Sequence, residues 1–90
     1  MKHAGAGTLE ALNDLLISLR ARAELVERRP GIFYVRGRAF LHFHEDPSGL
    51  FADLRDLCDW RRLRVNDTGE RANLLAVVDR ALQAGRKTGP

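Results

Sequence analysis

The chain has 90 residues, of which 44% are hydrophobic and 30% charged, and its net charge of +3 arises from 15 basic and 12 acidic residues. This composition is typical of one small globular domain and excludes a disordered polar segment. No apolar run approaches the roughly 18 residues of a membrane helix, and the single cysteine, Cys58, excludes an internal disulfide, so we expect a cytoplasmic protein with no membrane partner.

The first predicted element is an amphipathic helix over about residues 9–28. Leucines and other apolar residues recur there at spacings of three and four, which is the period of one helix face. Thr8 is suited to cap the start of this helix, and Pro30 is suited to end it. Residues 1–7 show no such period, so we expect them to form a loose N-terminal arm.

Three strands are predicted between residues 30 and 55. Residues 32–36 are large and β-branched, and residues 39–44 alternate between two faces. A turn at 37–38 would join these strands, but a two-residue and a three-residue turn give the first strand opposite faces, so its face stays open. The turn at 46–49, with proline second and glycine fourth, leads into the third strand.

This second turn sets the register of the two central strands. A four-residue loop places Phe43 opposite Ala52 and His42 opposite Asp53. The apolar residues of both strands then share one face, and a slip of one residue would mix the two faces. The apolar pattern therefore supports this register.

The last third of the chain predicts a strand and a helix. Residues 60–65 alternate in polarity, and apolar residues recur at helical spacing over about 69–83. Asp67 and Glu70 have the spacing of a capping box at the start of the helix. Gly85 would end it and leave a loose tail to residue 90.

Together these elements predict a single α+β domain over residues 1–90, a four-stranded antiparallel meander with an N-terminal and a C-terminal helix on one face. The other face of the sheet is left open and carries more large aromatic residues than a solvated face normally does. Such a patch is typical of an interface, so we expect a small binding or interaction module that forms a homodimer through this face. The candidate binding or interface residues are Phe40, His42, His44, Phe51, Asp53, Arg55, Trp60, Arg62 and Arg64.

His42, His44 and Asp53 form the candidate chemical site on the open face. Two histidines one residue apart on a strand, with a carboxylate beside them, are the ligand types of a two-histidine, one-carboxylate metal site. His42 and Asp53 could also act together as a general base, although an ordinary cross-strand polar pair is the favoured interpretation. No serine or second cysteine is placed beside them as a nucleophile, so no reaction is predicted.

Arginine and aromatic residues on one sheet face are also typical of proteins that stack single-stranded bases. Thirteen of the 15 basic residues are arginines, which bind phosphate through two parallel hydrogen bonds. The glycine and aromatic signature of RNA-recognition strands is absent, however. Nucleic-acid binding is therefore an alternative that the sequence does not favour.

Residues 37–46 (GRAFLHFHED) and 50–54 (LFADL) resemble small bacterial proteins that carry a "luciferase family" domain label. Those proteins share a glycine-basic strand that leads into His-X-His-X-Asp, a nearby Ala-Asp-Leu, a strand that begins with tryptophan, and a final helix. Trp60 and the predicted C-terminal helix fit that order, and the resemblance spans about residues 30–82. It implies an α+β fold and draws attention to the two histidines and the aspartate, but it implies no reaction. This chain is shorter just before Trp60, where those proteins have a further helical segment.

Overall fold

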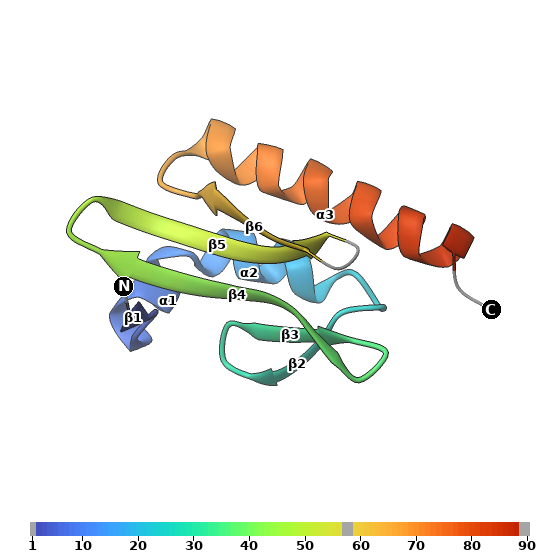
Figure 1. Ribbon diagram of the computed structural model, residues 1–90. Coiled ribbons are helices and arrows are strands. Elements are labelled where there is room, and N and C mark those ends of the chain that lie inside the picture. The colour runs from blue at the N-terminus through green and yellow to red at the C-terminus, as the bar shows by residue number, and fades with distance from the viewer. Residues whose placement is uncertain (1, 57–58, 89–90) are drawn as a thin grey trace.

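The computed structural model describes residues 2–56 and 59–88, which form an α+β fold (Figure 1). Cys58 lies outside the described residues. In chain order the elements are β1 (Lys2–His3), α1 (Ala6–Ala11), α2 (Asn13–Arg20), β2 (Val26–Arg29), β3 (Ile32–Val35), β4 (Arg38–Asp46), β5 (Gly49–Asp56), β6 (Asp59–Arg64) and α3 (Thr68–Thr88).

The strands form one antiparallel sheet in which β2 to β6 lie side by side in chain order. β1 pairs with the end of β4 at His44 and Glu45, beyond the part of that strand that pairs with β3. The predicted antiparallel meander is confirmed, but its count of four strands is wrong because β1 and β2 are additional. None of the helices in the described residues is long and apolar enough to cross a membrane.

The N-terminal third differs from its prediction. The expected helix over residues 9–28 is broken at Leu12 and ends at Arg20, and β2 follows where the last turns were expected. Glu27 holds this arrangement, since its carboxylate accepts hydrogen bonds from Arg20 (2.6 and 3.0 Å) and from the backbone N–H of Gly31 (2.9 Å). These hydrogen bonds of Glu27 stabilise β2 and its turn in place of the last helical turns that the spacing of apolar residues predicts.

The predicted loose arm and the predicted helix cap are also wrong. Residues 2–3 form β1, and α1 already begins at Ala6. Thr8 lies within α1, and its hydroxyl donates a hydrogen bond to the carboxylate of Glu45 on β4. This contact, together with the pairing of β1, ties the start of the chain to the sheet.

The C-terminal helix extends further than predicted, because α3 continues through Gly85 to Thr88. The guanidinium of Arg86 pairs with the carboxylate of Glu24, which holds the last turns against the loop before β2. The predicted cap is confirmed in its main part: Asp67 Oδ1 accepts the N–H of Glu70 at 2.8 Å. The Glu70 carboxylate returns to the N–H of Asn66 (2.8 Å), one residue before the position that a capping box uses.

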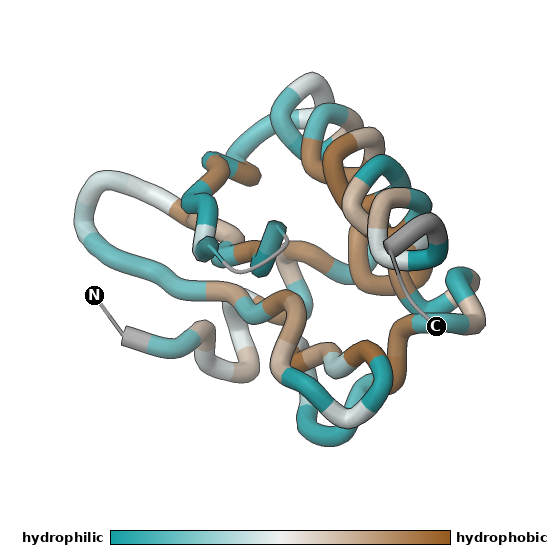
Figure 2. The backbone as a smooth tube through the Cα atoms, turned by 45° about the vertical axis from the view of Figure 1, so that its right-hand side comes forward, coloured by the Kyte–Doolittle hydropathy of each residue, from teal (hydrophilic) through white to brown (hydrophobic). Residues whose placement is uncertain are grey.

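The hydrophobic core lies between the helices and one face of the sheet. On the central strands Leu41, Phe43, Ala52 and Leu54 are almost fully buried, as predicted. In Figure 1 α2 lies behind the sheet and α3 runs along its β6 side, and Figure 2 shows the hydrophobic turns of α3 directed toward the sheet. The helical core residues are Leu12, Leu15, Leu16, Leu19, Leu74, Val77, Val78 and Leu82.

The register of β4 and β5 is the predicted one, with His42 opposite Asp53 and Phe43 opposite Ala52. The first hairpin turns at Arg36 and Gly37, one residue earlier than expected, and both have positive φ (53° and 79°) as a tight two-residue hairpin requires. Between this turn and residue 41 the register shifts by one residue, which is a β-bulge.

The β-bulge changes the face on which one predicted site residue lies. Phe40 was expected on the open face, but it is only 8% exposed and belongs to the hydrophobic core. The bulge also decides the face of β3, which the sequence left open. Phe33 pairs with Leu41 and is fully buried in the core, so the alternating Ile32 and Tyr34 lie on the open face.

Candidate metal centre

The open face of the sheet holds the predicted site residues other than Phe40. His42 and His44 on β4 alternate with core residues, and the pairing of β5 with β6 places Asp53 opposite Arg62. The same pairing places Phe51 opposite Arg64. Arg55 and Trp60 complete the set as a cross-strand pair.

The aromatic rings of this face are partly covered by arginines of the same chain. Guanidinium carbons lie 5.4 Å from the ring centre of Phe51, 4.7 Å from that of Trp60 and 4.6 Å from that of Tyr34. These are cation–π distances. Phe51 is 9% exposed and Trp60 43% exposed. The apolar patch is therefore smaller than the sequence predicted.

Three histidines converge at the centre of the open face. The pairing of β1 with β4 places His3 opposite His44, and their ring centres lie 4.8 Å apart. The rings of His42 and His44 are 4.7 Å apart, and those of His3 and His42 are 5.7 Å apart. One ligand atom from each ring lies within 4.8 Å of the other two. Sequence reasoning missed His3, although all three histidines of the chain meet here.

The position of His3 follows from contacts that the residues after it make with β4. The backbone N–H of Ala4 donates to the carbonyl oxygen of Phe43 at 3.1 Å, and the Thr8 hydroxyl bonds to Glu45. Two-residue strands have little intrinsic stability, so these contacts hold β1 against β4.

Several nitrogen atoms of the cluster are buried without a hydrogen-bond partner among the described residues. They are Nδ1 of His42 and both Nδ1 and Nε2 of His44. Buried polar atoms are nearly always paired, so each of these nitrogens needs an explanation. An imidazole nitrogen that carries no proton has a free lone pair and can bind a metal ion. Burial, and then the neighbouring His44, lower the pKa of His42, which favours its neutral form. The neutral imidazole is the form that binds metals.

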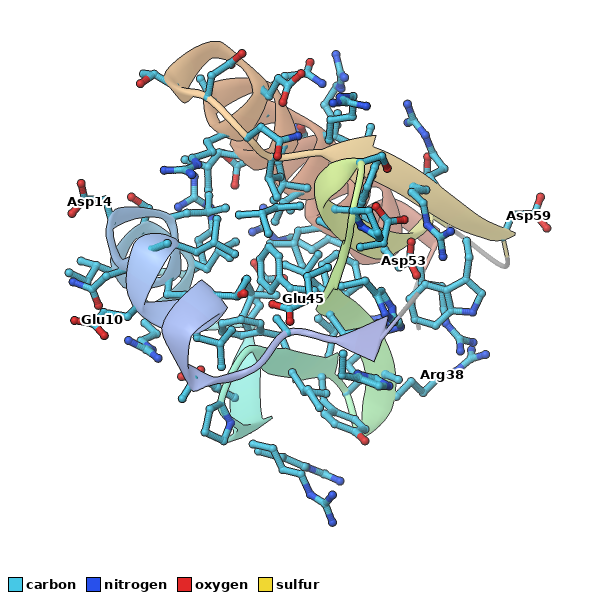
Figure 3. The ribbon with its side chains drawn as sticks, turned by 90° about the vertical axis from the view of Figure 1, so that its left-hand side faces the viewer. Glu10, Asp14, Arg38, Glu45, Asp53 and Asp59 are labelled. Carbon is cyan, nitrogen blue, oxygen red and sulfur yellow. The ribbon has the colours of Figure 1, made fainter. Side chains whose placement is uncertain are left out.

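Asp53 lies beside His44 and is held in place by Arg62. Its Oδ2 is 2.9 Å from His44 Nε2, although the two are not aligned as a hydrogen bond. Arg62 donates from Nε to Oδ1 (2.8 Å) and from Nη2 to Oδ2 (2.9 Å), and these bonds hold the pKa of Asp53 below its usual range. Figure 3 shows Asp53 between neighbouring side chains, whereas Asp14 and Asp59 point away from the molecule.

Asp53 therefore differs from its predicted role in one respect. The register places it opposite His42, but the imidazole nitrogen within hydrogen-bonding distance of it is that of His44. Because both of its oxygens already accept hydrogen bonds from Arg62, Asp53 is better placed to orient His44 than to complete a set of ligands. Trp60 closes the other side of the site, with its ring centre 4.9 Å from that of His42.

Comparisons with protein-family models, with curated proteins and with solved structures find no match for this chain. The resemblance to the proteins with a "luciferase family" label therefore stays a prediction, as does the cytoplasmic location. The geometry of the histidine cluster is the main basis for a functional proposal.

Proposed function

We propose that the protein binds a divalent transition-metal ion, zinc in the first place, through the imidazoles of His3, His42 and His44. The main support is the convergence of three rings from two paired strands, with the Nδ1 atoms of His42 and His44 buried and without a hydrogen-bond partner among the described residues. Imidazole nitrogen is a preferred ligand of zinc, copper, nickel and iron ions. Zinc is the first choice because it is usually bound by four ligands in a tetrahedral arrangement, three of which the protein could supply.

Three protein ligands would leave a fourth position on the metal for water or a small ligand. Zinc–nitrogen bonds of about 2.0–2.1 Å place tetrahedral nitrogens roughly 3.4 Å apart, so the rings would rotate inward on binding. Asp53 would then orient His44 from outside the ligand set, as a carboxylate does in many histidine–metal sites. The charges of Asp53 and Arg62 cancel, so the metal ion would give the centre of the open face a net positive charge.

The decisive experiment is zinc titration of the metal-free protein by calorimetry, together with its melting temperature with and without zinc. We expect one zinc ion per chain and a higher melting temperature when zinc is present, because a ligand of the folded state stabilises that state. His3→Ala is the most informative variant, since His3 is exposed and its loss leaves the core intact.

His3→Ala should weaken zinc binding at least about tenfold, and His42→Ala should do the same. Glu10→Gln is the matched control, because Glu10 lies on α1 and points outward in Figure 3. Absence of zinc binding to the wild-type protein, or equal affinities of the wild type and His3→Ala, would disprove the proposal.

A homodimer through the open face is a second proposal. Two large hydrophobic residues stay exposed on it, Val26 at 52% and Trp60 at 43%. Light scattering after size exclusion tests this proposal with the wild type and with Trp60→Ser. A monomer at tens of micromolar, with and without zinc, would reject the dimer.

Binding of single-stranded nucleic acid through the same face stays a prediction. The guanidinium groups stacked on Tyr34, Phe51 and Trp60 offer both charge and ring surfaces. Affinity for an oligonucleotide should then fall steeply with salt as counterions are released. Binding that is absent, or independent of salt, would reject it.

A further inference from the structure

A cavity of about 190 Å³ lies between the β3–β4 hairpin and the C-terminal end of α3. Figure 1 shows these two segments at the same end of the molecule, and Arg36 Nη1 reaches the carbonyl oxygen of Gly85 at 3.5 Å. None of the three histidines of the candidate metal centre lines this cavity. It is lined by Glu24, Val35, Arg36, Arg38, Ala39, Phe40, Arg55, Ala81, Leu82 and Gly85.

One part of this lining is apolar. Phe40 turns into the core at the β-bulge, and it lines the cavity together with Val35 of β3 and Leu82 of α3. Ligand cavities are mostly apolar, with a few polar groups that fix the orientation of the ligand. At about 190 Å³ the cavity is smaller than the roughly 300–1,000 Å³ of sites for drug-sized molecules, so it fits a small ligand.

The other part of the lining is strongly basic. Arg36, Arg38 and Arg55 all border the cavity, and the Nε atom of Arg55 is buried with no hydrogen-bond partner among the described residues. The acidic member of the lining, Glu24, is already paired with Arg86. The Glu24 carboxylate also attracts Arg36, so the lining has three guanidinium groups and one carboxylate that is shared with Arg86.

The backbone at Arg36 is a further sign of function. Arg36 has a φ of 53°, in the left-handed region where glycine, asparagine and aspartate are favoured at this turn position. A left-handed arginine costs stability relative to these residues. Strain of this kind is found most often where the side chain is needed for binding or catalysis.

We propose that this cavity binds a small amphipathic anion, with its carboxylate or phosphate group on the arginines and a short apolar body against Phe40 and Leu82. Guanidinium groups bind both kinds of oxyanion through paired, charge-assisted hydrogen bonds. The unpaired Nε of Arg55 gains a partner when the anion binds. The apolar part of the ligand would cover the apolar surfaces of the cavity lining and so remove them from water.

The test is titration with benzoate, phenyl phosphate and inorganic phosphate, in the presence of a chelator so that the metal centre is empty. Trp60 is the single tryptophan of the chain and stacks on Arg55, so its fluorescence reports on the cavity while calorimetry measures the affinity. We expect saturable binding of benzoate or of phenyl phosphate. The tighter of the two identifies the preferred oxyanion.

Arg36→Gly is the key variant, because glycine accepts the positive φ and the turn keeps its shape. It should lower the affinity about tenfold or more while leaving the melting temperature unchanged or higher. Arg38→Ala should also lower the affinity, and Arg80→Ala, at an exposed position of α3 outside the cavity, should leave it unchanged.

Three results would overturn the proposal. The first is the absence of saturable binding by benzoate and by phenyl phosphate. The second is an unchanged affinity in the variant that combines Arg36→Gly with Arg38→Ala. The third is inorganic phosphate binding as tightly as phenyl phosphate, which would exclude a role for the apolar lining. None of these results depends on whether zinc binds at the histidines.

Discussion

The two faces of the central strands are both shielded from water, but by different means. On one face Leu41 and Leu54 pack against the leucines of the helices and are fully buried. On the other face Asp53 is only 8% exposed, yet polar and cationic side chains surround it. The first face is thus buried by a hydrophobic core, and the second by arginines and imidazoles of the sheet itself.

This difference separates stability from function within one strand pair. Apolar packing stabilises the fold without placing unpaired polar atoms in the interior. The opposite face buries imidazole nitrogens that lack partners among the described residues, which costs stability unless a ligand binds them. Substitutions on the core face should therefore affect folding most, and those on the open face should affect binding most.

The largest effect is expected for Leu54→Ala on the core face. This substitution should lower the free energy of unfolding by about 2–5 kcal/mol, because it leaves a cavity beneath the helices. Leu63→Ala is the matched control, since Leu63 projects from the neighbouring strand to the same face but is only partly buried. Urea denaturation followed by circular dichroism measures both. Equal losses for the two variants would contradict a core centred on Leu54.

The second largest effect is expected for Asp53→Asn on the open face, which should lower the affinity for zinc. The amide cannot orient and polarise His44 as the carboxylate does, so the affinity should fall about 10–100-fold. Leu63→Ala, which lies outside the cluster, should keep the wild-type affinity. An unchanged affinity in Asp53→Asn would show that the carboxylate has no role in positioning His44.

Asp53→Asn should also lower the free energy of unfolding by about 1 kcal/mol at neutral pH, because the paired hydrogen bonds from Arg62 are weakened. The folded pKa of Asp53 is depressed, so this contribution is present above the unfolded value of about 3.9 and is lost as the pH falls through the lower folded value. The difference between wild type and variant should therefore shrink as the pH falls below about 4, where Asp53 takes up its proton.

The control for the pH series is Asp59→Asn, which removes a carboxylate that points outward on β6. Its difference from the wild type should be small at every pH. A difference for Asp53→Asn that keeps growing below about pH 4 would contradict the depressed pKa of Asp53.

The smallest effect is expected for Arg64→Ala, which removes the guanidinium above Phe51. An exposed cation–π contact contributes about 0.5–1 kcal/mol, so stability should fall by that amount or less. Arg80→Ala on the outer side of α3 is the control. If Arg64→Ala costs as much as Leu54→Ala, the open face contributes to the fold as much as the core does.

The sequence predicted the parts of the fold that rest on local patterns. The alternation of residues 39–44 and the turn at 46–49 were enough to set the register of His42 and Asp53, because only one register separates the apolar and polar faces. The spacing of Asp67 and Glu70 likewise predicted the start of α3.

The sequence could not predict the parts that depend on distant contacts. Val26 continues the helical spacing of the leucines before it, and β2 forms instead because Glu27 bonds to Arg20 and to the turn after it. The β-bulge that buries Phe40 cannot be recognised from the alternation of residues in β4. His3 reaches the site through a two-residue strand, for which no sequence pattern exists.

The place of His3 in the chain gives the proposed metal a second consequence. A metal ion bound to His3 and His42 would join two positions 39 residues apart and act as a reversible cross-link. Because the unfolded chain lacks this site, the metal ion would stabilise the folded state in which β1 is paired with β4. The amide hydrogen of Ala4, bonded to Phe43 beside the cluster, should then exchange with deuterium more slowly when zinc is bound. Metal supply would in this way set how firmly the first strand is held to the sheet.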